Sequence, residues 1–231
     1  IDGAPVALPG HTSFATVQSF GPDARNVVTT SGDGTARVWT VNGSNVRSVV
    51  LAGHSDSVNY AAFSPDGKQL VTASSDWTVR VWTIVGDRAF VIALVKHQGP
   101  VYFAAFLEGG SRILTSGQDG TIRIWATEQN KRNYIELPVQ GKYLRSANFS
   151  PNGRRVITTY HDGSARVWTW SPGPLSSILL PGHSGSVITP TFHPDGKRVL
   201  TASDDGKARL WTLERSSASS IALGNHSAEL V

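Results

Sequence analysis

Three polar side chains recur along this chain every 43 residues, and together their types could do chemistry. A histidine comes first, a threonine follows 18 residues later, and an aspartate follows four residues after the threonine. The positions are His11, Thr29 and Asp33; His54, Thr72 and Asp76; His97, Thr115 and Asp119; Thr158 and Asp162; and His183, Thr201 and Asp205. An imidazole between a carboxylate and a hydroxyl is the arrangement of a nucleophilic triad, and clustered imidazoles can bind a metal ion.

Repetition argues against both chemistries. Catalysis needs one constellation with an exposed nucleophile, whereas near-identical sets recur here. The histidines lie far apart in sequence, with no short His-x-His or Cys pair to complete a metal site and no Gly-x-x-x-x-Gly-Lys loop for phosphate. We therefore expect no catalytic residue, no metal and no cofactor, and we interpret the recurring side chains as internal framework.

A tryptophan keeps the same interval, at Trp39, Trp82, Trp125, Trp168 and Trp211. A period of this length is typical of solenoids, propellers and arrays, because such units cannot bury their apolar faces alone and must stack on neighbours. In the fourth unit Gln140 takes the place of the histidine. The polar set of that unit is therefore predicted to be incomplete or rewired, and we expect the fourth unit to have the lowest hydrogen-exchange protection.

The second unit is predicted to form four short antiparallel strands. The segments 58–63, 69–74, 78–82 and 90–94 have the apolar content and alternation of strands. Pro65 and Gly67 indicate a turn between the first two, since proline presets φ and glycine accepts a positive φ. No unit contains a convincing amphipathic helix, so the predicted fold class is all-β.

These features resemble the WD-repeat β-propeller family of the bacterial, tandem type. The pairs that match its Gly-His are Gly10-His11, Gly53-His54 and Gly182-His183, and segments 63–68 and 201–206 match its pattern around the first turn and the corner. The recurring tryptophans match its Trp. The aspartate that follows this Trp in the family is replaced here by Thr40, Thr83, Ala126, Thr169 and Thr212. The resemblance covers essentially the whole chain.

The resemblance implies a β-propeller built from four-stranded antiparallel blades. One propeller region then spans 1–231, with repeats at 11–53, 54–96, 97–139, 140–182 and 183–225. Residues 1–10 are expected to supply a preceding outer strand, and 226–231, starting at His226, are expected to begin a further repeat. Five repeats are fewer than the family commonly uses to close a ring, so we expect this region to belong to a larger propeller.

The resemblance also implies where partners bind. Within each blade the His, Thr, Asp and Trp form a buried hydrogen-bonded set, while the Gly-His loop and the Asp-Gly corner lie on the face where protein partners commonly dock. Recognition is then expected from side chains that differ between units. The predicted partner-binding residues are Phe14, Asn59, Trp77, Tyr102, Tyr143, Arg145, His161 and Ile188. Aromatic residues and arginine dominate interface hot spots, and Trp77 replaces the usual corner glycine.

Composition bounds the partner classes. The net charge is +4, but Lys and Arg are spread along the chain, so no nucleic-acid partner is expected. No apolar run approaches the length of a membrane span, so no membrane partner is expected. The absence of cysteine excludes disulfides and thiolate chemistry. We expect a cytoplasmic chain that binds a protein or peptide and is covalently continuous with further blades or other domains.

Two function classes stay open. The first is a non-catalytic interaction scaffold or sensor module of a larger signalling protein, because near-identical tandem repeats of this kind are similar to those of bacterial signalling NTPases and kinases. The alternative is a propeller enzyme or small-ligand-binding propeller with a site at the channel mouth. That alternative needs convergent polar residues at the first strands, where Asn59 and Arg145 occur without a carboxylate cluster.

Overall fold

The structure, a computed structural model, describes residues 7–43, 45–86, 88–94, 97–107, 110–127, 134–137, 144–151, 154–169, 175–188 and 190–225. Two compact units make up the chain: the N-terminal unit, residues 1–139, and the C-terminal unit, residues 140–231. Their boundary coincides with the predicted boundary between the third and fourth repeats. Among the residues that the structure describes, no helix is long and apolar enough to span a membrane.

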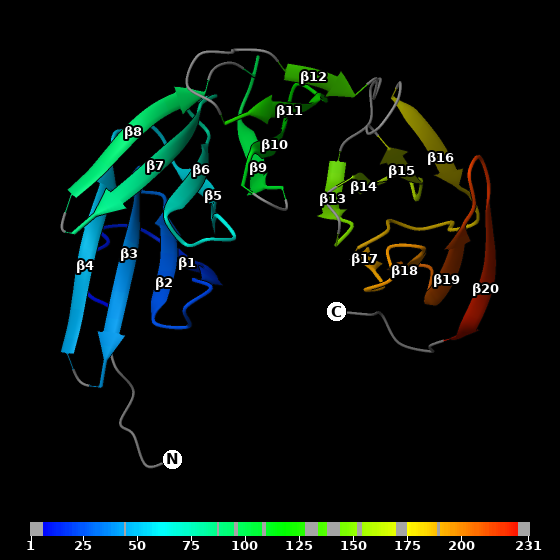
Figure 1. Cartoon of the computed structure of the whole chain (residues 1–231), viewed down its shortest axis with the longest axis horizontal. Helices are drawn as coiled ribbons and strands as arrows, with labels where there is room; N and C mark the ends of the chain where they lie inside the picture. The colour runs from blue at the N-terminus through cyan, green and yellow to red at the C-terminus, as the bar shows by residue number, and fades with distance from the viewer. Residues whose placement is uncertain are drawn as a thin grey trace. The chain divides into compact units, whose positions relative to one another are not determined.

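The N-terminal unit contains three four-stranded antiparallel sheets, each with its strands side by side in chain order (Figure 1). The first sheet has β1 (Ala15–Phe20), β2 (Asn26–Ser31), β3 (Thr35–Asn42) and β4 (Asn45–Ala52). The second has β5 (Val58–Phe63), β6 (Gln69–Ser74), β7 (Val79–Val85) and β8 (Arg88–Leu94). The third has β9 (Val101–Phe106), β10 (Arg112–Gly117), β11 (Ile122–Ala126) and β12 (Tyr134–Leu137).

The C-terminal unit contains two sheets of the same order. The fourth sheet has β13 (Leu144–Phe149), β14 (Arg155–Tyr160), β15 (Ala165–Thr169) and β16 (Ser176–Leu180). The fifth has β17 (Thr191–Phe192), β18 (Arg198–Ala202), β19 (Lys207–Leu213) and β20 (Ala218–Asn225). Strand β17 is short because Pro190 has no N–H to donate to a ladder. The chain before it meets the end of β18 through an isolated bridge between Val187 and Ser203 and through the Ile188 N–H, which donates to the Ala202 carbonyl.

These elements confirm the predicted fold class, an all-β chain of four-stranded antiparallel sheets. In the second sheet, β5 and β6 have the predicted bounds. The third and fourth strands extend further toward each other than predicted: β7 runs on to Val85, which pairs with Arg88 across a tight hairpin that contains Gly86 at a φ of +60°. At the N-terminus, Ala7 and Leu8 lie outside any strand, and Pro5, Val6, Gln140, Tyr143 and His226 lie outside the described residues.

Apolar side chains hold neighbouring sheets of a unit together. One interface has Val28, Ala36, Val38 and Leu51 of the first sheet against Val58, Ala61, Leu70 and Trp82 of the second. The next has Val71, Ala73, Val79 and Val81 of the second against Val101, Ala104, Phe106 and Ile113 of the third. In the C-terminal unit, Ile157, Ala165, Val167, Ile178 and Leu180 meet Phe192, Val199, Trp211 and Leu213. Each sheet thus buries its core by stacking, as repeat units must.

Each sheet has two ends, which matter for function. The corner edge carries the loop before the first strand and the tight corner between the second and third strands. The turn edge, at the opposite end of the strands, carries the turn between the first and second strands and the hairpin between the third and fourth.

Candidate functional site

A chain of hydrogen bonds crosses the corner edge of the second sheet. The Trp82 indole N–H donates to Thr72 Oγ1 at 2.9 Å, and His54 Nε2 lies 2.7 Å from the same hydroxyl. His54 Nδ1 lies 2.9 Å from Asp76 Oδ2. A neutral imidazole protonated on Nδ1 satisfies every group: it donates to Asp76 and accepts the Thr72 hydroxyl proton. All four side chains are therefore partnered inside the protein, with the imidazole fully buried.

The same chain recurs in three other sheets. The His–Asp, His–Thr and Trp–Thr distances are 3.0, 2.8 and 2.8 Å for His11, Asp33, Thr29 and Trp39. They are 3.0, 2.8 and 2.8 Å for His97, Asp119, Thr115 and Trp125. They are 3.1, 2.9 and 2.8 Å for His183, Asp205, Thr201 and Trp211. Each set binds its loop and its corner to its own sheet, so none leaves a nucleophile open for chemistry.

Electrostatics favour a neutral histidine beside a charged aspartate. Burial lowers the pKa of His54 and of His97, against the opposing pull of the neighbouring carboxylate. For Asp76, burial opposes ionisation, but hydrogen bonds from Thr78 and His54 lower its pKa to about 2. Asp119 has a pKa of about 2 for the same kind of reason, with the Gln98 backbone N–H contributing first among its hydrogen bonds. The carboxylate thus fastens the corner.

In the fourth sheet a phenol stands in for the missing imidazole. Trp168 still donates to Thr158 Oγ1 at 2.9 Å, and the Tyr160 hydroxyl lies 2.8 Å from that same Oγ1. Asp162 still accepts bonds from Ser164, through its backbone N–H at 2.9 Å and its hydroxyl. Tyr160 is buried, and burial raises its pKa. The set is therefore rewired around Thr158.

Predicted partner-binding residues of the N-terminal unit fall into two groups. The side chains of Phe14, Trp77 and Tyr102 are 81%, 53% and 51% exposed. Asn59 is half-buried, and its amide donates to the Val101 carbonyl at 2.9 Å and to Ser75 Oγ at 3.0 Å. Asn59 thus ties the first strands of the second and third sheets together, whereas the aromatic residues are available to a partner.

Three predicted residues lie in the C-terminal unit. Arg145, in β13, and His161, in the corner of the fourth sheet, are exposed. Ile188 is half-buried, and its backbone N–H donates to the Ala202 carbonyl at 2.9 Å. Tyr143 lies outside the described residues.

The corner of the second sheet differs from the corners of the other four. Trp77 has a φ of +71°, in the left-handed region that glycine adopts freely and other residues rarely do. The equivalent residues are Gly34, Gly120, Gly163 and Gly206, with φ between +71° and +80°. The second sheet therefore holds a large aromatic side chain in a strained corner conformation.

A family model for the WD domain, G-beta repeat matches the chain five times, at residues 5–40, 44–83, 89–126, 136–169 and 174–212. These matches cover most of the sequence. The chain belongs to the WD40 repeat family. A search of curated proteins found no significant match to it. Proteins built from WD40 repeats generally mediate protein–protein interactions or scaffolding and are typically non-enzymatic.

Sequence reasoning missed two parts of the WD40 framework. The first is a hydroxyl two residues after each corner aspartate in four sheets, at Thr35, Thr78, Thr121 and Ser164, which donates to the carboxylate. Its 43-residue period was a usable signal. The second is Tyr160. It occupies the position of Ser31, Ser74, Gly117 and Ser203, and a bulky phenol among small residues, in the unit that lacks the histidine, could have revealed it.

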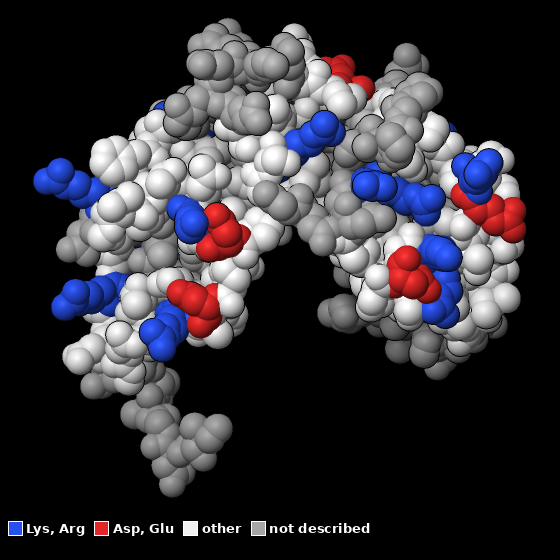
Figure 2. Space-filling model, viewed as in Figure 1, with Lys and Arg blue, Asp and Glu red and all other residues white. Residues whose placement is uncertain are grey.

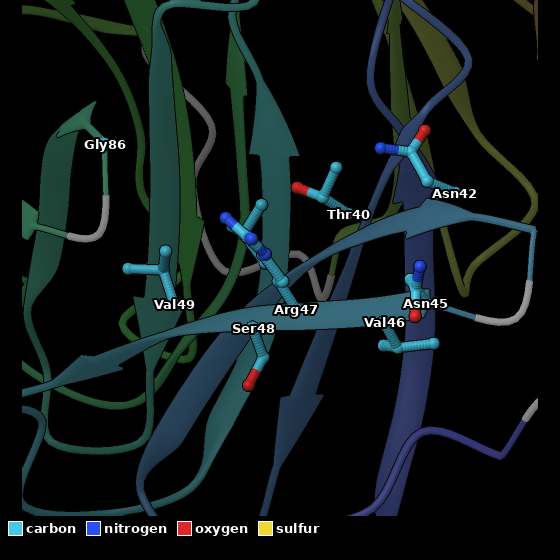
Figure 3. Close-up of a pocket in the computed structure, with 9 residues that line it drawn as sticks. Thr40, Asn42, Asn45, Val46, Arg47, Ser48, Val49 and Gly86 are labelled. Carbon is cyan, nitrogen blue, oxygen red and sulfur yellow. The ribbon is translucent and has the colours of Figure 1, made fainter.

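A groove of about 640 Å³ lies at the turn edge of the WD40 sheets, between the β3–β4 hairpin and Gly86. Figure 3 shows Thr40, Asn42 and Arg47 around it. Its described lining contains no Asp, Glu or His to act as a general acid or base. It also lies away from the first strands, where the small-ligand alternative placed its site.

Proposed function

We propose that this chain is a non-catalytic protein-interaction module that binds a protein or peptide partner through the corner edge of its sheets. The main observation in support is Trp77, whose indole is exposed and whose φ is positive, at a position where the other four corners have glycine. A non-glycine residue in this conformation costs roughly 1 kcal/mol. About half of this large aromatic surface stays exposed to solvent, so a role in binding accounts for its presence.

Neighbouring residues support the same surface. Tyr102 is the second residue of β9 in the third sheet. Ser75, two residues before Trp77, is hydrogen-bonded to Asn59, which in turn bonds Val101, the residue before Tyr102. Trp77 and Tyr102 therefore lie on adjoining sheets that are fixed to each other. Rigid, amphipathic Trp and Tyr side chains are the types that carry most binding energy at interfaces.

The finer parts of this proposal rest on the resemblance to tandem repeats of bacterial signalling proteins. They are a role as scaffold or sensor of a larger signalling protein, and a cytoplasmic location. A co-purification of the full-length protein with its neighbouring domains tests the first, and fractionation of its cells tests the second. No observation on the described residues favours the enzyme alternative.

Continuity with further blades is part of the proposal. Leu200, Ile221 and Leu223 of the fifth sheet are exposed. The residues equivalent to Leu200 and Leu223 in the first sheet, Val28 and Leu51, are fully buried against the second sheet, and Val49, the equivalent of Ile221, is partly buried there. Another blade would cover them in the same way. Because the chain has no cysteine, Ile221→Cys offers a test: we expect rapid labelling by a soluble maleimide in the monomeric chain. Protection of that thiol in a monomer would contradict the idea.

The docking surface is tested by quantitative affinity capture with the wild-type chain and three variants. Trp77→Gly restores the corner residue of the other sheets, so it removes the indole without strain, and Tyr102→Ala removes the second ring. Phe90→Ala is the control, because Phe90 is exposed on outer strand β8, away from the corner edge. We expect the first two variants to lose partner recovery and the control to keep it. Equal recovery by all four proteins would rule out this surface.

A further inference from the structure

The groove at the turn edge of the N-terminal unit is lined by polar side chains that the fold leaves unused. Its walls are the outer strands of the first sheet, β3 and β4, and the β7–β8 hairpin of the second sheet at Gly86. The side chains of Asn42, Asn45 and Arg47 are exposed, and they form no hydrogen bond or ion pair with the described part of the chain. These groups are therefore open to a ligand.

Three cross-strand pairs line the face of the first sheet that borders this groove. Side chains alternate between the two faces of a sheet, so every second pair lies on the same face. The pairs are Val38 with Val49, Thr40 with Arg47, and Asn42 with Asn45. Val38 belongs to the buried interface with the second sheet, so this face is the one that looks toward that sheet. From the core outward, the groove is thus aliphatic, then cationic, then amide-bearing.

The cation in the middle pair is a local departure from the repeat. A threonine of the third strand recurs at this level, and the residue opposite it is Phe90 in the second sheet, Ser176 in the fourth and Ser219 in the fifth. Only the first sheet, among these four, places an arginine there. Arg47 is therefore not part of the recurring framework.

No carboxylate of the described lining neutralises Arg47, since that lining contains no Asp or Glu. Figure 2 shows the same situation at a larger scale. Basic side chains over the inner strands of the N-terminal unit have red neighbours, whereas those at its outer edge, over β4 and β8, have none among the described residues. The groove is thus complementary to a single anionic group.

We propose that this groove binds the C-terminal end of a partner peptide whose last residue is apolar. The Arg47 guanidinium matches the terminal carboxylate, which it can hold by two parallel charge-assisted hydrogen bonds. Val38 and Val49, next to Arg47 on the same face, would contact the last side chain. The amides of Asn42 and Asn45 both donate and accept, so they suit the peptide groups that precede the carboxylate.

Other anions match the groove less completely. A fatty acid could use Arg47 and the two valines, but it has no group that pairs with the amides of Asn42 and Asn45. A nucleic acid gains its affinity from several cations placed along successive phosphates, and Arg47 is the single cation of the described lining. A peptide end is the ligand that uses all three levels.

This site is independent of the corner-edge surface. It lies at the turn edge, at the opposite end of the strands from Trp77. The inference therefore goes beyond the proposed function, and either surface can fail without the other.

The probe is the peptide Gly-Ser-Gly-Ser-Leu with a free carboxylate, titrated into the ¹⁵N-labelled full chain and followed by NMR. The side-chain amides of Asn42 and Asn45 and the N–H of Gly86 report on the groove. Two further peptides test the ligand's chemistry: the same sequence with an amidated C-terminus, and one that ends in Ser instead of Leu. The test variant is Arg47→Gln. Its control is Arg88→Gln, which removes an equally exposed cation from the hairpin of the second sheet, outside the described lining.

We expect the reporter signals to shift and to saturate with the free-carboxylate peptide. Amidation and Arg47→Gln should each weaken binding at least about tenfold, because each removes one partner of a charge-assisted pair. The two losses should not add, since they remove the same contact. The peptide that ends in Ser should bind several-fold more weakly, Arg88→Gln should change binding by less than about twofold, and Trp77→Gly should leave it unchanged.

Four results would overturn the proposal. They are no saturable shift of the reporters up to about 5 mM peptide, equal affinity for the free and amidated peptides, equal losses in Arg47→Gln and Arg88→Gln, and tighter binding of octanoate or a short oligonucleotide than of the peptide. Spectra that match the wild type away from the groove check that both variants fold.

Discussion

The second and fourth sheets depart from the repeat in opposite places. The second keeps the full set of His54, Thr72, Asp76 and Trp82 but carries Trp77 in its corner. The fourth keeps Gly163 in its corner but has Tyr160 in its polar set. The first departure is exposed and strained, and the second is buried and hydrogen-bonded.

The two departures therefore have different causes. Tyr160 supplies a hydroxyl to the same Thr158 that the imidazole would have contacted, so it repairs the loss of the histidine. Trp77 repairs nothing, because the aspartate, histidine and threonine around its corner are already partnered. In a repeat protein, a compensated departure is explained by folding, whereas an uncompensated one, such as Trp77, is where we look for a role other than folding.

The largest expected effect comes from truncating the buried tryptophan of each sheet, Trp82 and Trp168. Both indoles are buried to the same degree and donate to a threonine at 2.9 Å. Trp82→Ala and Trp168→Ala are each expected to lower the free energy of unfolding by about 3–5 kcal/mol, measured by urea titration with circular dichroism. A much smaller cost in the fourth sheet would show that Tyr160 leaves its set loose.

A corner glycine should tolerate replacement by a larger residue far less well than the presence of Trp77 suggests. At Gly163 the φ is +80° and a Cβ would lie 2.7 Å from the Gly185 carbonyl oxygen, so Gly163→Ala is expected to cost about 2 kcal/mol. Gly120→Ala is the matched control, because its φ is similar but no atom lies within 4 Å of its Cβ. We expect it to cost about 1 kcal/mol in the same titration. Equal costs would mean that the approach of Gly185 is unimportant.

The sequence alone predicted the recurring hydrogen-bonded sets, but it did not predict that Tyr160 compensates for the missing histidine of the fourth set. The 43-residue period placed the strands, the corners and the four-residue sets, because each depends on residues of the same unit. Tyr160 escaped notice because its role depends on a contact with Thr158 that only matters once the histidine is gone.

The repair itself is tested by Tyr160→Phe, which keeps the ring and removes the hydroxyl. Thr158 then loses one partner in a buried site, so we expect a loss of about 1 kcal/mol in the free energy of unfolding. Hydrogen exchange followed by mass spectrometry should show the loss in β14 and β15 and leave β6 and β7 unchanged. A neutral result would mean that the Thr158 hydroxyl is satisfied without Tyr160, for example by the Arg166 carbonyl at 3.3 Å.

Mild acid should lower the stability of the second sheet more than that of the fourth. The pKa of His54 is lowered by burial, so below about pH 6.5 the unfolded chain binds a proton that the folded chain does not, and stability falls as the pH falls. The tyrosine of the fourth set binds no proton in this range. Between pH 7.5 and 5.5 we expect amide protection to fall severalfold more in β6 and β7 than in β14 and β15, after correction for intrinsic exchange. Uniform loss across both sheets would contradict this assignment.

Further losses of stability are expected between about pH 4 and 2, where Asp76, with its pKa of about 2, takes up a proton.

The smallest expected effect is a gain, not a loss, in the free energy of unfolding. Trp77→Gly removes a left-handed non-glycine residue from the corner, which favours folding by roughly 1 kcal/mol, while glycine loosens the unfolded chain and cancels part of that gain. The corner hydrogen bond from residue 77 N–H to the Ser74 carbonyl, 3.3 Å long, needs no side chain and should persist. We therefore expect a net stabilisation of about 0.5 kcal/mol, read as a small rise in the urea midpoint. If the variant were instead destabilised by more than about 1 kcal/mol, the indole would be packing usefully, and Trp77 would become a compensated departure like Tyr160. A stabilised variant that no longer captures a partner would separate the two roles of this residue, since the change that improves folding would be the one that abolishes recognition.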